Sequence, residues 1–76
     1  MPVLTEQFRE VIDRLSNSID SAKSAQSLGL PFKSQKNFII ELSNWTKEQD
    51  WWKFLSKDQI EEYNYWIQKA KITIGL

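Results

Sequence analysis

The last third of the chain carries the sequence feature that most restricts the fold, a helix start followed by one apolar stripe. Ser56 and Gln59 match the capping box, in which each side chain accepts a hydrogen bond from a free backbone N–H at a helix start. Leu55 and Ile60 flank the cap as a hydrophobic staple. Apolar residues then recur at spacings of three and four, at Ile60, Tyr63, Ile67, Ala70 and Ile74. This pattern predicts an amphipathic helix over residues 57–74.

The first third predicts a second long helix, over residues 5–28. Thr5 is a suitable N-cap, and one face carries the apolar residues Phe8, Val11, Ile12, Leu15, Ile19 and Ala22. Gly29 suits the left-handed position after a helix, Leu30 can fold back toward Ala25, and Pro31 prevents continuation. The helix should therefore end immediately before Gly29.

Two shorter helices are predicted between the long ones, over residues 35–45 and 47–55. Ser34 is a candidate cap for the first, whose core face would carry Phe38, Leu42 and Trp45, with Ile39 beside it. Thr46 and Gln49 form a second match to the capping box, which predicts a break at Thr46.

These segments predict an all-α single domain over residues 1–76, a compact bundle of three to four helices. The two long helices would be roughly antiparallel and the two short ones would close one end, because short links favour antiparallel neighbours. A chain this short and without cysteine depends on apolar packing for its stability. The centre of the core is expected to contain Phe8, Ile12, Leu15, Ile19, Leu42, Leu55, Ile60, Tyr63 and Ile67.

The composition argues against enzymatic chemistry. The chain has no His and no Cys, so it lacks an imidazole base, a thiol nucleophile and the commonest metal ligands. Its two glycines are too few for a loop that cradles a nucleotide phosphate. We therefore expect a protein without catalytic residues, cofactor or metal, and with no small-molecule substrate.

Charge and hydropathy indicate the compartment and limit the partners. Ten basic and ten acidic residues give a net charge of zero, without the basic footprint typical of nucleic-acid binding. No segment has the long apolar run of a signal peptide or a membrane-spanning helix. A cytoplasmic protein with no membrane association is expected.

The functional prediction rests on apolar residues that the core does not require. Tyr65, Ile72 and Leu76 lie opposite the core stripe of the last helix, and Trp66 lies at its boundary. Tyr and Trp are enriched in binding hot spots. We predict a small protein-binding module, an adaptor or a regulator or inhibitor of a larger protein, with a homodimer as one form. Its interface would contain Tyr65, Trp66, Ile72, Leu76, Ile40 and Trp51.

The alternative is a small helical nucleic-acid-binding protein. Lys33, Lys36, Lys47 and Lys53 would contact phosphates, and Trp51 or Trp52 would stack on bases. The acidic residues in the same region argue against this reading, so the preferred partner is another protein or a second copy of the chain.

Overall fold

The computed structural model describes residues 3–75, with side chains from residue 6 onward, and over this range it contains helices and no strand. The elements are α1 (Val3–Ser27), α2 (Lys33–Glu48), the 3₁₀ helix η1 (Asp50–Phe54) and α3 (Lys57–Ile74). The all-α prediction is confirmed.

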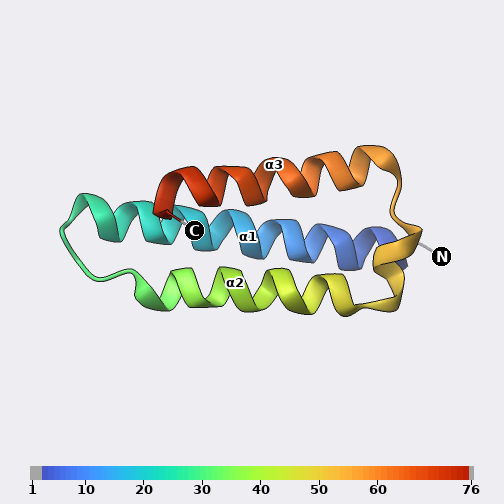
Figure 1. The fold of residues 1–76 in the computed structure, drawn as a ribbon, viewed down its shortest axis with the longest axis horizontal. Coiled ribbons are helices and arrows are strands. Elements are labelled where there is room, and N and C mark those ends of the chain that lie inside the picture. Colours follow the sequence, from blue (N-terminus) through green and yellow to red (C-terminus); the bar gives the residue numbers. More distant parts are fainter. Residues whose placement is uncertain (1–2, 76) are drawn as a thin grey trace.

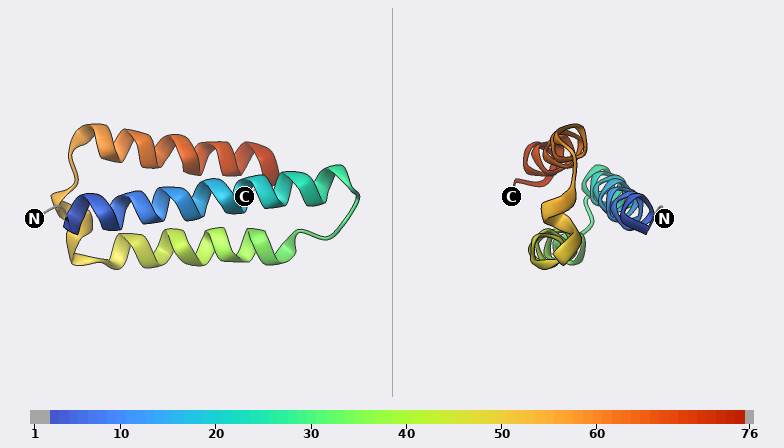
Figure 2. Two further views of the ribbon diagram at one scale, coloured as in Figure 1. Left: turned by 180° about the vertical axis from the view of Figure 1, so that it is seen from behind. Right: turned by 90° about the vertical axis from the view of Figure 1, so that its right-hand side faces the viewer.

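The three α-helices lie side by side in a rod measuring 43 × 18 × 17 Å (Figure 1). α2 runs back along α1, and η1 then carries the chain across the end to α3, which runs in the same direction as α1 (Figures 1 and 2). An ion pair of 3.3 Å between Arg9 and Glu62 joins the second turns of the two long helices. The predicted antiparallel arrangement of these helices is therefore wrong, because the partner antiparallel to both is α2.

Two of the helix ends predicted from capping chemistry, at Ser56 and at Gly29, are confirmed at atomic detail. At the start of α3, the Gln59 N–H donates to Ser56 Oγ at 3.2 Å and the Ser56 N–H donates to Gln59 Oε1 at 2.9 Å. At the end of α1, Gly29 has φ of 70°, and the Leu30 N–H donates to the Ala25 carbonyl at 2.8 Å. Glycine adopts this left-handed conformation without a steric cost, so the chain can reverse after α1.

The predicted boundaries in the middle of the chain are wrong. α2 continues through Thr46 to Glu48, and the fully buried Thr46 hydroxyl donates to the Leu42 carbonyl at 2.7 Å, so it caps no helix. The helix expected over 47–55 is the short η1. α2 begins at Lys33 with Phe32 in the N-cap position, not at Ser34. α1 begins at Val3, so Thr5 lies inside the helix.

α1 supplies most of the core, since it packs against both α2 and α3 (Figure 2). Six of the nine residues expected at the centre are fully buried, namely Phe8, Ile12, Leu15, Ile19, Leu42 and Tyr63. Leu55 and Ile67 are partly buried against this cluster, and Ile60 is also only partly buried. Ile39 is fully buried, whereas Phe38 and Trp45, expected on the core face of α2, are exposed. The core face of α2 is therefore rotated from the prediction toward Ile39 and Thr46.

Within residues 3–75, none of the helices is both long enough and apolar enough to span a lipid bilayer.

Candidate protein-interaction surfaces

The outer face of α3 exposes two large apolar side chains. Tyr65 is 59% exposed and Ile72 is 77% exposed. They are seven residues apart, which is two turns, and they lie opposite the buried stripe of Tyr63, Ala70 and Ile74. The fold buries one side of α3 and leaves an apolar stripe on the other.

Trp66 and Lys69 extend this stripe sideways toward α1. The rings of Tyr65 and Trp66 meet edge to face, with centroids 5.3 Å apart and an interplanar angle of 82°. Lys69 Nζ lies 5.0 Å from the centre of the Trp66 ring, at cation–π distance. Trp66 is partly buried against the core and therefore anchors the exposed Tyr65 ring. We call Tyr65, Trp66, Lys69 and Ile72 the α3 outer face.

The remaining predicted interface residues do not join the α3 outer face. Ile40 lies on α2, beside Ile67 and Lys71, in a hollow between α2 and α3. Trp51 belongs to η1 at the end of the rod and is partly buried against the core. Leu76 lies outside the described residues. The structure therefore brings together Tyr65, Trp66 and Ile72 and separates them from Ile40 and Trp51.

The residues proposed for nucleic-acid contact are divided in the same way. Lys33, Lys36 and Lys47 lie on one side of α2, at spacings of three and eleven residues, and Lys53 belongs to η1. Trp51 and Trp52 are partly buried against the core, and the Trp52 ring meets the Tyr63 ring edge to face at 4.8 Å. The tryptophans proposed to stack on bases are thus partly engaged in packing against the core.

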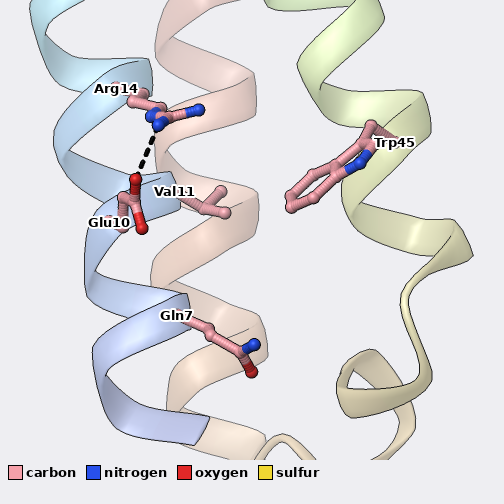
Figure 3. Close-up of a pocket in the computed structure, with 5 residues that line it drawn as sticks. All are labelled: Gln7, Glu10, Val11, Arg14 and Trp45. Carbon is pink, nitrogen blue, oxygen red and sulfur yellow. Dashed lines mark hydrogen bonds and ion pairs between the residues drawn. The ribbon is translucent and has the colours of Figure 1, made fainter. Parts of the chain in front are cut away.

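A hollow of about 270 Å³ lies between α1 and α2 and is lined by Gln7, Glu10, Val11, Arg14 and Trp45 (Figure 3). The Trp45 ring extends from α2 toward Val11 of α1 (Figure 3). Glu10 and Arg14 pair with each other at 2.6 Å, so the two charged side chains of the hollow already satisfy one another. This arrangement gives the hollow no unpartnered charge with which to hold a polar ligand.

The exposure of Phe38 and Trp45 is the surface feature that sequence reasoning missed. Both lie on the α1 side of α2, seven residues apart, and line separate hollows between these helices. The signal for it was the spacing of Ile39, Leu42 and Thr46, which fits a core stripe as well as the spacing of Phe38, Leu42 and Trp45.

The hydroxyl of Tyr63 has a shifted pKa. Burial raises the pKa of the Tyr63 hydroxyl above its usual value of 10.0, and a hydrogen bond with Ser43 partly opposes this. Within the described residues, no group of three or more His, Cys, Asp or Glu is arranged to hold a metal ion. Burial of Tyr63 in the core explains the shift of its pKa, so the shift is not evidence of a functional site.

Comparison of the chain with models of known families, with curated proteins and with solved structures finds no match. Its function must therefore be inferred from its own surfaces.

Proposed function

We propose that this chain is a small, non-enzymatic protein-binding module, an adaptor or a regulator of a larger protein, that acts through the α3 outer face. The observation that carries the proposal is the pair of exposed side chains Tyr65 and Ile72 on one stripe of a helix whose opposite side buries Tyr63, Ala70 and Ile74. Contiguous apolar surface on a small protein commonly marks a contact site.

The aromatic cluster supports this choice of face. A hot spot is most effective when its side chains are already ordered, because less conformational entropy is lost on binding. The edge-to-face contact with Trp66 restricts the Tyr65 ring, and Lys69 packs over the Trp66 ring. The α3 outer face thus offers an anchored aromatic residue and an aliphatic residue about 10 Å apart along the helix axis.

The partner is another protein or a second copy of the chain. In a homodimer, the α3 outer face would pack against itself about a twofold axis, with Tyr65 of one copy near Ile72 of the other. The absence of His from the sequence supports a role without acid–base catalysis. The absence of Cys fits a cytoplasmic protein, which is the location we propose.

The test combines Tyr65→Ala with Ile72→Ser and measures the molar mass by light scattering over a hundredfold range of concentration. A wild-type mass of twice the 9.0 kDa chain that falls to the monomer in the variant supports the homodimer. For a monomeric wild type, immobilised protein should retain a partner from cell extract that the variant does not retain.

The matched control is Leu28→Ala with Phe54→Ala, which removes two equally exposed apolar side chains outside α3. All variants should keep the wild-type far-ultraviolet circular dichroism. Equal association by the wild type and the Tyr65→Ala, Ile72→Ser variant would refute the proposal, and so would an equal loss in the control.

A further inference from the structure

Two hollows follow one another along the side of α2 that borders α3. The first is about 500 Å³ and is lined by Pro31, Phe32, Lys33, Lys36 and Asn37. The second is about 170 Å³ and is lined by Ile39, Ile40, Ser43 and Asn44 of α2 and by Ile67 and Lys71 of α3. The α2 residues that line them recur at spacings of three and four, so the hollows share one side of the helix. We call this surface the α2–α3 groove.

The floor of the groove is apolar. Ile39 is fully buried, Phe32 and Ile67 are partly buried against the core, and Ile40 completes the floor at 42% exposure. The groove exists because α2 and α3 pack more closely against α1 than against each other. A bound segment could therefore bury apolar side chains without any rearrangement of the helices.

The rim is cationic at the end formed by Lys33, Lys36 and Lys71. Within the described residues, none of these three ammonium groups lies within ion-pair distance of a carboxylate, since the two ion pairs found there are Arg9–Glu62 and Arg14–Glu10. The acids of α3, Asp58, Glu61 and Glu62, all lie in its first six residues, and the last of them is nine residues before Lys71, about 14 Å away along the axis. Among the described side chains, this end of the groove therefore has positive charge with no carboxylate within ion-pair distance.

We propose that the α2–α3 groove binds an acidic amphipathic helix of another protein. Its apolar residues would pack on Ile40 and Ile67, and its carboxylates would pair with Lys33, Lys36 and Lys71. The groove side of α2 from Lys33 to Lys47 is about 21 Å long, which matches about four turns of a bound helix. The inference goes beyond the proposed function, because it uses a different face and names the chemistry of the partner.

Charge and shape together favour a protein helix over nucleic acid or an anionic membrane. A nucleic acid would use the lysines but would leave the Ile40–Ile67 floor uncovered, and Trp51 and Trp52 pack elsewhere. A membrane surface requires an apolar face that protrudes between the basic residues, whereas Ile39 and Ile67 are recessed. An acidic amphipathic helix would cover the apolar floor with its apolar side chains and pair its carboxylates with the lysines of the rim.

The probe is a labelled peptide of about four turns, with Leu at helical spacings of three and four and Glu at the flanking positions. Fluorescence anisotropy should give saturable binding in the micromolar range. Amide shifts in nuclear magnetic resonance spectra should be confined to residues 32–47 and 64–74. A peptide with Gln in place of every Glu should bind at least about fivefold more weakly, as should one with Ser in place of every Leu.

The protein variant that tests the charge is Lys33→Glu with Lys71→Glu, two exposed residues. It should raise the Kd for the acidic peptide about tenfold, because two attractive contacts become repulsive. The matched control, Lys23→Glu with Lys53→Glu, makes the same change in net charge at exposed sites outside the groove and should stay within about twofold. Ile40→Ala tests the floor and should raise the Kd about fivefold.

The proposal is wrong if the acidic peptide shows no saturable binding, if both charge variants weaken it equally, or if the shifts map outside the groove. Tighter binding of a single-stranded deoxythymidine oligonucleotide, or of vesicles containing phosphatidylserine, would also overturn it and reassign the lysines to that ligand. Circular dichroism confirms the fold of each variant, and Lys33→Gln with Lys71→Gln, expected to raise the Kd about threefold, replaces the Glu variant if that one unfolds. The outcome is independent of Tyr65 and Ile72, so this proposal and the proposed function can fail separately.

Discussion

At the scale of single residues, Tyr63 of α3 is a side chain that links several elements. It is almost fully buried among the core residues of α1 and α2, its hydroxyl donates to Ser43 Oγ of α2 at 3.0 Å, and its ring meets Trp52 of η1. Burial disfavours the phenolate, so the pKa of the hydroxyl is raised above 10.0 in the folded state, against the smaller effect of the Ser43 hydrogen bond.

This shift predicts a loss of stability in alkali. Well below pH 10, Tyr63 is protonated in both the folded and the unfolded state, so its ionisation does not change the free energy of unfolding. Above pH 10 the unfolded chain releases this proton before the folded protein does, so the free energy of unfolding falls as the pH rises. Urea unfolding between about pH 8 and about pH 11 should show this decline. Tyr63→Phe should reduce the slope of this decline; a slope equal to that of the wild type would contradict this account.

Two capping patterns in the sequence had different outcomes, and the difference is physical. Ser56 and Gln59 satisfy free backbone groups at the start of α3, as the sequence predicts. Thr46 and Gln49 match the same pattern, but the Thr46 side chain is buried and bonds back to the Leu42 carbonyl, four residues earlier. A Ser or Thr hydroxyl can either cap a helix start or bond to a carbonyl of the preceding turn. Burial of Thr46 in the tertiary structure favours the second bond.

At the scale of elements, α2 shows how an ambiguous stripe is resolved by packing. Apolar or aromatic side chains stand at positions 38, 39, 40, 42 and 45, which surround more than half of the helix. The structure buries Ile39 completely and leaves Phe38 40% exposed. The groove proposed above exists only because of this rotation, since it places Ile40 at the edge facing α3.

We therefore predict that two adjacent substitutions in α2 differ sharply. Ile39→Ala should lower the free energy of unfolding by about 2–5 kcal/mol, because it leaves a cavity in the core. Phe38→Ala should lower it by about 1 kcal/mol, although it removes the larger side chain, because much of that ring is exposed. Chemical denaturation followed by circular dichroism measures both values. The reverse order would mean that Phe38 faces the core, as the sequence pattern alone suggested.

A candidate surface was predictable from the sequence where it lies on a single helix, and was not predictable where it lies between two helices. The long apolar stripe of α3 fixes which side is buried, so Tyr65 and Ile72 were correctly expected on the opposite side. The α2–α3 groove was not predictable, because it depends on the distance between two helices and on which side of α2 meets α3. Ile40 was recognised as surplus to the core, but its neighbours Ile67 and Lys71 come from the other helix.

At the scale of the whole molecule, the direction of the helices was not predictable from the sequence. The expected third helix would have left α3 antiparallel to α1, whereas the short η1 only crosses the end of the rod (Figure 1). α1 consequently packs against both other helices, and its residues Leu15 and Ile19 are completely inaccessible to solvent.

This arrangement predicts that the fold is a single cooperative unit. A fragment of residues 1–55 lacks α3 and would expose much of the core face of α1, so it should show little helix and no sigmoidal thermal transition. Circular dichroism of the fragment, compared with the full chain, measures this. Adding a synthetic peptide of residues 56–76 should restore helicity. A fragment that unfolds cooperatively without the peptide would show that α1 and α2 form a stable pair.

The parallel course of α1 and α3 has a mechanical consequence. The start of α1 and the end of α3 point toward opposite ends of the rod (Figure 1). A pulling force applied through these two points draws the helices along each other, so the packed side chains between them bear the load together in shear. Helices joined in the antiparallel sense would instead be peeled apart from one end, one turn at a time. We therefore expect this arrangement to resist tension along the rod better than an antiparallel pair of the same helices would.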